Sequence, residues 1–297
     1  MDFTLPTNSS DTTPTVTSVP VMTFDATARE RFHAAYFRHK YPVVVKGAID
    51  AWPARQWDLD YLTRQTGERV VRVRHSASER FVSPAEAATT KLMPFAEAAA
   101  LIDSPAGAGH YVLQQSLRRT FPGLLGDIGE LSLLNSLQFV LQSNFWLGAT
   151  GCKTHLHYDL SDNFLIQIRG VKKLFLYPDF LGYGLYPDRH GPMPFCSRLD
   201  VFGGVDTAQF PLYPEVNGAR HEVTLHPGDL LYIPRRWWHA VETVETAVSL
   251  NFWWNSVDSL SETRELASAI GTQGWWGLRY QATELAKRAR LGKTPGQ

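Results

Sequence analysis

The sequence contains only two cysteines, Cys152 and Cys196, among its 297 residues. Two cysteines are too few for a disulfide framework or for a zinc site built from thiolates, and such scarcity is typical of a reducing compartment. We therefore expect a cytoplasmic protein. Cys152 stands five residues before His157. It is interpreted either as a metal ligand or redox sensor, or as a small buried hydrophobic residue.

The sequence also lacks an excess of charge, because 29 lysine and arginine residues balance 29 aspartate and glutamate residues. No overall electrostatic field draws the protein to nucleic acid or to an anionic membrane, although a local basic patch stays possible. No stretch approaches the roughly 18 consecutive apolar residues of a membrane span. Residues 1–20 are rich in threonine, serine and proline and do not resemble a signal peptide. We expect a disordered tail at residues 1–20, and neither a membrane nor a nucleic acid as partner.

Strands dominate the predicted secondary structure after residue 109. Runs of apolar and β-branched residues, bounded by turn residues, carry this prediction. The expected strands are residues 110–115, 137–147, the segment around His157, 163–169, 171–177, 230–233, 237–244 and 247–254. Residues 163–177 are expected to form a hairpin that turns at Arg169-Gly170. Many short strands with regular turns predict a mainly β fold with flanking helices, and a jelly roll or barrel at its core.

Helices are expected at both ends of this β-rich part. The first hundred residues mix expected strands at 41–47 and 69–75 with a helix at 94–102, so residues 21–255 form one domain with an N-terminal α/β extension. Residues 256–297 predict C-terminal helices, since apolar residues recur at three- and four-residue spacing. Such a stripe packs on its own sheet or on a second copy. We expect a homodimer, with these helices as a possible dimerisation element.

A metal site is predicted by His157, Asp159 and His239. Residues two apart in a strand point to the same side, so His157 and Asp159 can converge on one ion, and a later strand can bring His239 to the same point. Two imidazoles and one carboxylate form the facial triad of non-haem Fe(II), which leaves positions open for an oxidisable co-substrate and for oxygen. His155 precedes His157 by two residues, and we expect it to line the pocket or contact substrate.

A wider set of motifs carries a family resemblance. The motifs are Pro42 to Gly47, Trp52-Pro53, His157-Tyr158-Asp159, Asn163-Phe164, Gln167 to Lys172, Pro227 to Pro234, Trp238-His239 and Ser249 to Trp254. Together they resemble the JmjC-type, cupin-like 2-oxoglutarate oxygenases. Within that family the chain is similar to the hydroxylase branch, which includes the asparaginyl hydroxylase that inhibits the hypoxia-inducible factor. The resemblance implies a double-stranded β-helix core and a catalytic domain.

The resemblance also implies roles for single residues. It implies that His157, Asp159 and His239 hold the iron. Lys172 then pairs with the distal carboxylate of 2-oxoglutarate, beside the Thr154 hydroxyl and the Tyr111 phenol. Asn163 and Asn251 match amides near the metal-bound end of the co-substrate, and Trp253 matches an aromatic residue near the iron.

Each of these roles has a simpler alternative. A shift in strand register would exchange Lys172 and Lys173. Tyr111 and Trp253 could be ordinary core residues, and Asn163 and Asn251 could satisfy strand ends.

The function implied is an Fe(II)- and 2-oxoglutarate-dependent dioxygenase that uses O2, hydroxylates a C–H bond and releases succinate and CO2. Its substrate is a protein or peptide side chain or an amino-acid-like small molecule. The alternatives are a non-oxidative metal-binding cupin that acts as a scaffold or sensor, an N-methyl lysine demethylase and, more weakly, a zinc hydrolase. Residues 179–220, rich in proline, glycine and aromatic residues, are interpreted as a lid or a substrate-contacting insertion.

Overall fold

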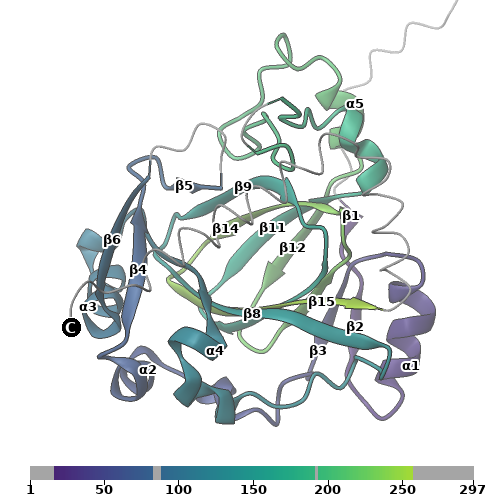
Figure 1. Ribbon diagram of the computed structural model, residues 1–297. Helices are drawn as coiled ribbons and strands as arrows, with labels where there is room; N and C mark the ends of the chain where they lie inside the picture. The colour runs from purple at the N-terminus through teal and green to yellow at the C-terminus, as the bar shows by residue number, and fades with distance from the viewer. Residues whose placement is uncertain (1–16, 83–87, 191–192, 257–297) are drawn as a thin grey trace, which may run out of the picture.

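The computed structural model of the protein describes residues 17–82, 88–190 and 193–256. Two β-sheets face each other at its centre (Figure 1). One sheet has the strand order β1-β12-β11-β14-β9-β5, and the other has the order β2-β3-β13-β10-β15-β8-β7-β4-β6. The strands are β1 (Thr17–Ser18), β2 (Val21–Thr23), β3 (Val43–Lys46), β4 (Val70–His75), β5 (Arg80–Phe81), β6 (Thr89–Pro94), β7 (His110–Ser116), β8 (Gln138–Gly148), β9 (Lys153–Tyr158), β10 (Asp162–Arg169), β11 (Lys172–Tyr177), β12 (His221–Leu225), β13 (Leu230–Ile233), β14 (Trp238–Thr243) and β15 (Ala247–Ser256).

The helices are short and lie around these sheets. The α-helices are α1 (Ala28–Phe32), α2 (Leu59–Thr66), α3 (Phe95–Ile102), α4 (Leu117–Thr120) and α5 (Tyr213–Asn217). A π-helical turn, η1 (His33–Phe37), continues α1, and the 3-10 turns are η2 (Pro53–Gln56), η3 (Pro105–Gly107), η4 (Pro122–Asp127) and η5 (Asp179–Tyr183). None of the helices within the described residues is long and apolar enough to cross a membrane.

Eight consecutive strands, β8 to β15, form a double-stranded β-helix. Four of them, β12-β11-β14-β9, lie in one sheet, and the other four, β13-β10-β15-β8, lie in the opposite sheet. The neighbours within each set are antiparallel. This arrangement confirms the predicted cupin-like jelly roll, with a mixed α/β part before it.

The predicted hairpin at Arg169-Gly170 is wrong. β10 pairs with β13 and β15, whereas β11 pairs with β12 and β14, so the turn at Gly170 passes from one sheet to the other. Both strands are buried along nearly their whole length, and each therefore takes two neighbours inside its own sheet. Gly170 has a φ of 69°, and a Cβ there would collide with the carbonyl oxygen of Thr246.

Apolar side chains fill one end of the space between the sheets. Leu174 and Leu176 of β11 pack there with Leu165, Leu231 and Val44 from the opposite sheet. The outer face of the nine-stranded sheet carries a second core, in which α1 contributes Phe32. The Phe32 ring meets Tyr232 edge-on at 5.0 Å between centroids. The first of these cores packs the two sheets against each other, so strand register decides which side chains meet inside the barrel.

Segments outside the barrel extend or cover its sheets. β4, β6 and β7 widen the nine-stranded sheet, and α3 contacts them. Thr17 and Ser18, which the sequence places in the tail, form β1 and pair with His221 and Glu222 of β12. The rest of the predicted tail and the predicted C-terminal helices, residues 1–16 and 257–297, lie outside the described residues.

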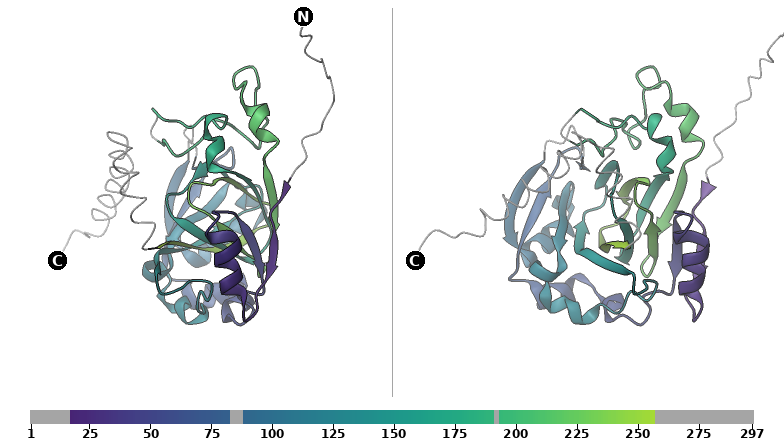
Figure 2. Two further views of the ribbon diagram at one scale, coloured as in Figure 1. Left: turned by 90° about the vertical axis from the view of Figure 1, so that its right-hand side faces the viewer. Right: turned by 45° about the vertical axis from the view of Figure 1, so that its right-hand side comes forward.

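The segment between β11 and β12 projects beyond the ends of the strands (Figures 1 and 2). It includes η5 and α5 and contributes Leu185, Leu199, Phe210 and Val216 to an apolar cluster of its own. Trp238 of β14 and Leu156 of β9 join the same cluster. The segment is therefore packed against the two strands that carry His157 and His239.

Candidate metal centre and co-substrate pocket

His157, Asp159 and His239 meet at one end of the barrel. His157 of β9 is the register partner of His239 of β14, and their ring centroids lie 4.2 Å apart. Asp159 follows β9 directly, and its Oδ2 lies 3.8 Å from Nε2 of His239. One ligand atom from each residue lies within 4.8 Å of the other two, which is a spacing that suits a metal ion. The structure thus brings together the three residues selected from the sequence.

Both imidazoles are held with one nitrogen free. Nδ1 of His157 lies 2.7 Å from the carbonyl oxygen of His155, and Nδ1 of His239 lies 3.0 Å from that of Trp237. A carbonyl can only accept, so each Nδ1 carries the proton and each Nε2 keeps its lone pair. Burial, and then the neighbouring His239, lower the pKa of His157 to about 4. His157 is therefore neutral at physiological pH, as a metal ligand must be.

Asp159 is positioned from both sheets. Its Oδ2 accepts a hydrogen bond of 2.9 Å from Nε1 of Trp253, which lies on β15 in the opposite sheet. Its backbone carbonyl accepts one of 2.8 Å from the N–H of Arg236. Arg236 has a φ of 67°, so the turn before β14 adopts a left-handed conformation to make this contact. Trp253, selected as an aromatic residue near the metal, therefore contacts a ligand directly.

An irregularity in β9 decides which side chains share the metal side. His157 pairs with His239 and Thr154 pairs with Val241, so two residues of β9 oppose the single residue Ala240. Register partners point to the same side of a sheet, as do residues two apart on β14. Thr154 and His157 therefore share one side although they are three residues apart, because the β-bulge changes the alternation.

We expected His155 to line the pocket or contact substrate, and the bulge places it away from the metal side, while contact with substrate stays a prediction. The alternation that would have placed it beside His157 is interrupted at the bulge. Its Nε2 instead lies 2.9 Å from the carbonyl oxygen of Ser197, and the side chain is buried. Burial lowers the pKa of His155. His155 fastens the segment 179–220 to β9 and is absent from the metal triad.

Lys172 points into the barrel, and Lys173 points out. On β11, Lys172 and Leu176 share one side, and Leu176 is the register partner of His239. Lys172 therefore faces the interior four residues, or roughly 13 Å, from the level of the triad. It is 2 % exposed, whereas Lys173 forms a 2.8 Å ion pair with Glu222 at the surface.

The Lys172 amine has no carboxylate partner within the described residues, and it donates a 3.2 Å hydrogen bond to the Tyr111 hydroxyl. Burial lowers the pKa of Lys172 to about 7. Burial raises the pKa of Tyr111, and a hydrogen bond with the Thr154 side chain opposes that shift. A buried amine without a counter-ion destabilises the protein unless an anion binds there. Lys172, Tyr111 and Thr154 are thus the side chains in this part of the barrel that could hold a carboxylate.

Amide side chains form the wall of the pocket opposite the triad. Nδ2 of Asn251 donates to Oδ1 of Asn163 at 3.2 Å, and Oδ1 of Asn251 accepts from Nδ2 of Asn144 at 3.0 Å. Nε1 of Trp146 donates to the same oxygen at 2.8 Å. All three asparagines are buried. Asn163 and Asn251 are therefore members of one network on the inner face of the nine-stranded sheet, and they do not end strands.

The comparisons with known proteins agree with this geometry. A family described as the cupin-like domain matches residues 29–260. The chain belongs to the cupin-like domain family. It is 30% identical over 237 residues to lysine-specific demethylase 8 of Xenopus tropicalis, which covers 76% of this chain and 51% of that protein. It is 31% identical over 239 residues to lysine-specific demethylase JMJ30 of Arabidopsis thaliana, which covers 76% of this chain and 53% of that protein.

A further relative is human tRNA wybutosine-synthesizing protein 5, which is 28% identical over 262 residues, or 81% of this chain and 79% of that protein. The chain spans about half the length of the two demethylases. The resemblance drawn from the sequence is thus confirmed for the JmjC oxygenase superfamily. These relatives do not single out the asparaginyl hydroxylase branch.

Two residues of this JmjC pocket escaped the sequence analysis. Asn144 is a fully buried amide directly before the apolar run Phe145 to Leu147, which is the signal that could have identified it. Gly148 is the register partner of Tyr111, and a Cβ at Gly148 would come within 3.0 Å of the Tyr111 ring. Glycine at this position therefore leaves room for the Tyr111 ring beside Lys172.

Cys152 is a buried thiol near Lys172 and takes no part in the metal triad. Its Sγ contacts the carbonyl oxygen of His110 at 3.4 Å. Burial raises the pKa of Cys152 to about 12, so the thiol stays protonated and is a poor ligand. This environment favours the interpretation of Cys152 as a small buried residue.

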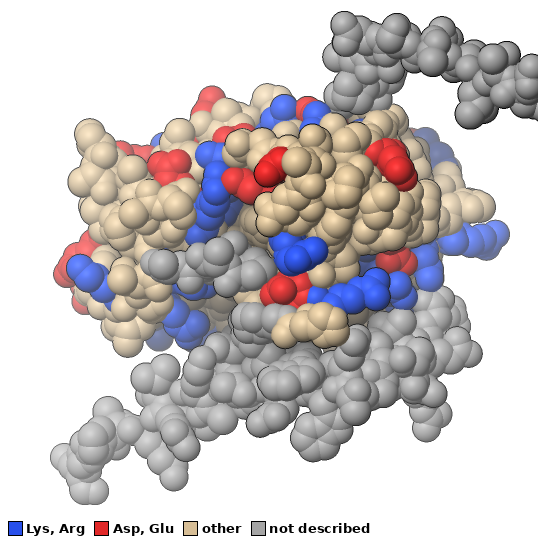
Figure 3. All heavy atoms as spheres, turned by 90° about the horizontal axis from the view of Figure 1, so that it is seen from above, with Lys and Arg blue, Asp and Glu red and all other residues tan. Residues whose placement is uncertain are grey.

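The face of the molecule that carries the segment 179–220 has charges of both signs. In Figure 3, lysine and arginine side chains lie among aspartate and glutamate side chains on this face. Two ion pairs hold the segment: Arg80 of β5 with Asp200 at 2.5 Å, and Arg236, in the turn before β14, with Asp179 at 3.1 Å. The described residues that this view shows therefore form no continuous basic surface for a polyanion.

Proposed function

We propose that this chain is an Fe(II)- and 2-oxoglutarate-dependent oxygenase that hydroxylates a C–H bond and releases succinate and CO2. The observation that carries the proposal is the buried amine of Lys172, on the same side of the barrel as the His157, Asp159 and His239 triad. A metal-binding cupin without oxidative activity needs no buried cation at this depth. A small dicarboxylate that reaches from the triad to Lys172 gives both features a purpose.

The donor set fits the iron. Two imidazoles whose Nδ1 atoms are held by backbone carbonyls, together with one carboxylate, are the ligands of the facial triad. When bound, Fe(II) supplies the activation of O2, and 2-oxoglutarate supplies the two electrons that are lost as it is converted to succinate and CO2. The protein residues bind and orient these groups and exclude water.

Each pocket residue has a definite task in this proposal. His157 and His239 each present one lone pair, and Trp253 fixes the orientation of Asp159. Lys172 balances the charge of the distal carboxylate, and Tyr111 and Thr154 donate hydrogen bonds to it. The amides of Asn163 and Asn251 define the opposite wall. The segment 179–220, packed on β9 and β14, covers the mouth and selects the substrate.

The substrate class we propose is a protein or peptide side chain, or an amino-acid-like small molecule. The mixed charge of the face around the segment 179–220 supports this class over nucleic acid, even though one relative is named for tRNA modification. The names of two relatives favour lysine demethylation as a second candidate. Hydroxylation adds one oxygen to the product, whereas demethylation releases formaldehyde, so mass spectrometry and a formaldehyde assay distinguish them.

The test is the conversion of 2-oxoglutarate to succinate by the full-length protein with Fe(II) in air. We expect turnover that requires oxygen and is lost in His157→Ala and Asp159→Ala. Full activity in both variants would show that the triad is assigned wrongly. Metal binding without succinate formation, in the presence and absence of candidate peptides, would favour the non-oxidative cupin.

Two further proposals concern the cellular location and the oligomeric state of the protein. We propose a cytoplasmic protein, in keeping with its two reduced cysteines, and a homodimer through residues 257–297. Light scattering of the full chain and of a chain that ends at Ser256 tests the dimer. A full-length chain with the mass of a monomer would refute it.

A further inference from the structure

Half of strand β8 has a neighbour on one side only. β15 pairs with β8 along its whole length, from Gly148 to Gln138. β7 pairs with β8 only from Gly148 to Asn144, because the chain then turns into α4. Within the described residues, Gln138–Ser143 therefore has a free edge on the side of α4 (Figure 1). A free edge offers unpaired N–H and C=O groups to another extended chain.

This edge lacks two of the features that usually keep an edge strand unpaired, namely charge and proline. Its residues, Gln138 to Ser143, include no charged residue and no proline. Leu137 is 54%, Phe139 39%, Val140 42% and Leu141 53% exposed. Its one irregularity is the register shift at Leu141. An exposed apolar strand of this kind is suited to pairing with a partner.

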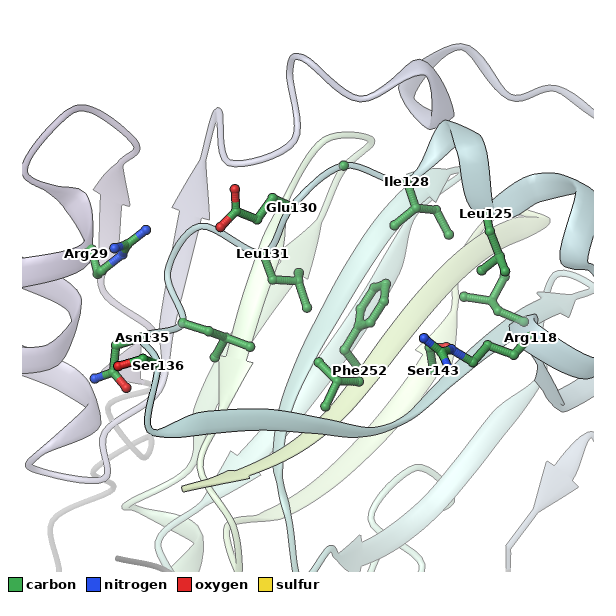
Figure 4. Close-up of a pocket in the computed structure, with 14 residues that line it drawn as sticks. Arg29, Arg118, Leu125, Ile128, Glu130, Leu131, Asn135, Ser136, Ser143 and Phe252 are labelled. Atoms are coloured by element: carbon green, nitrogen blue, oxygen red, sulfur yellow. The ribbon is translucent and has the colours of Figure 1, made fainter. Parts of the chain in front are cut away.

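A hollow runs beside the edge. It has a volume of about 370 Å³ and lies between α4 and β8, lined by Ser116, Arg118, Arg119 and residues 140–143. A second cavity, of about 660 Å³, opens on the outer face of the same sheet (Figure 4). Arg118 and Ser143 lie at one end of it, and Phe252 lies on its floor. There is thus room for an added strand and for its side chains.

The charges at the end of this edge fit an acidic partner. Arg118 and Arg119 are exposed and form no ion pair within the described residues. They follow β7 directly, so they stand where a strand added to β8 would meet α4. Two arginines without counter-charges at the end of a free edge attract a chain that carries aspartate or glutamate there.

The edge leads to the metal centre. Gln142 is the register partner of Trp253, and the Trp253 indole donates to Asp159. Nε2 of Gln142 also donates to Oδ1 of Asn144 at 2.6 Å, at the start of the amide network. A chain on the edge of β8 would therefore lie one strand away from the residue that holds a metal ligand.

We propose that Gln138–Ser143 binds an extended segment of a substrate polypeptide by strand addition, with acidic side chains of that segment at Arg118 and Arg119. The inference rests on the proposed function in one respect, namely that the partner is a substrate. Strand addition draws its affinity from main-chain hydrogen bonds, which a polypeptide supplies at the repeat of a strand and RNA does not. The free edge therefore favours a polypeptide over a nucleic acid.

The test uses the full-length protein and a fluorescein-labelled peptide of twelve residues that alternates valine and threonine between pairs of aspartates. Two matched peptides carry N-methyl groups on alternate amides, in one register or the other. We expect the parent peptide to bind and to slow amide exchange at residues 138–143. At least one N-methylated peptide should bind about tenfold more weakly or worse. Arg118→Ser with Arg119→Ser should weaken binding about tenfold, while Arg64→Ser, an exposed arginine on α2, should not.

Several results would overturn the proposal. They are the absence of binding at millimolar peptide, equal affinities of all three peptides, and a slowing of amide exchange at residues other than 138–143. Tight binding of a twelve-nucleotide RNA in place of the peptide would assign the surface to nucleic acid. Slow amide exchange at residues 138–143 without any peptide would mean that the edge is already occupied by this protein. If that protection depends on protein concentration, the occupant is a second copy. If it is lost when the chain is truncated after Ser256, the occupant is residues 257–297. His157→Ala should abolish succinate formation and leave peptide binding intact, so the two proposals fail separately.

Discussion

The indole of Trp253 donates a 2.9 Å hydrogen bond to the carboxylate of Asp159, from the sheet opposite the one that carries His157 and His239. Asp159 is the member of the triad that lies outside a strand. The N–H of Arg236 binds only the backbone carbonyl of Asp159, so the bond from Trp253 is what orients the carboxylate toward His239. One hydrogen bond thus ties the two sheets together at the metal centre.

Trp253→Phe should therefore weaken metal binding about 10- to 100-fold, the usual effect of losing a group that orients a ligand. Titration calorimetry with Mn(II) measures this without turnover. Trp57→Phe is the matched control, because the Trp57 indole also donates to a carboxylate, Asp127, at 2.8 Å but far from the barrel interior. Equal affinities in the wild type and Trp253→Phe would mean that the bond is incidental.

Replacing Lys172 should separate stability from function. Its pKa is about 7 in the folded protein, below the ordinary value of 10.5. As pH falls from 10.5 to 7, the unfolded chain gains a proton at Lys172 that the folded chain does not. This group therefore lowers the free energy of unfolding by about a few kcal/mol over that pH range. Lys172→Met should raise the melting temperature at pH 7.5 and greatly weaken 2-oxoglutarate binding.

Lys173→Met is the control for that substitution. It removes a surface ion pair with Glu222, which contributes at most about 1 kcal/mol. We expect little change in 2-oxoglutarate binding. If both substitutions weakened 2-oxoglutarate binding equally, the assignment of Lys172 as the one lysine of the pair that faces the co-substrate would be wrong.

The same shift predicts that 2-oxoglutarate binds with uptake of a proton above pH 7. A dianion beside Lys172 favours the charged amine, so the affinity should fall as pH rises from 7 to 9, by up to about tenfold per unit. Calorimetry in two buffers with different heats of ionisation counts the protons. In Lys172→Arg, whose guanidinium stays charged, the uptake should vanish. A pH-independent affinity in the wild type would contradict the assignment.

Much of this site follows from the sequence because its signals are local. His157 and Asp159 are adjacent in a motif, and Lys172 lies on a strand whose alternation separates it from Lys173. Long-range pairing is where prediction fails. The bulge that aligns Thr154 with His157 appears only when β9 is set against β14. The hairpin at Gly170 fails because β10 and β11 each find two better neighbours in different sheets. Asn144 lies over 100 residues before its partner Asn251, and a spacing pattern does not connect them.

The amide network should be cooperative. Asn251→Ala leaves Asn144, Trp146 and Asn163 each without a hydrogen-bond partner that they now have. Each buried polar group left unsatisfied costs about 1–3 kcal/mol, so urea denaturation should show a loss of several kcal/mol. Trp146→Phe removes only one donor and should cost less. Combining the two substitutions should cost less than the sum of their separate effects, because they remove the same bond. Simple additivity would argue against a shared network.

The bulge in β9 gives neighbouring residues opposite tasks. Thr154→Val keeps the shape of the side chain but removes the hydroxyl beside Tyr111, so it should raise the 2-oxoglutarate requirement and leave metal affinity unchanged. His155→Ala should leave both affinities nearly unchanged, because its ring bonds to Ser197 in the segment 179–220. Loss of that bond should instead make this segment open more often, and limited proteolysis should cut it faster. A large loss of metal affinity in His155→Ala would mean that the His155 imidazole lies at the metal. The bulge would then not turn His155 away from His157.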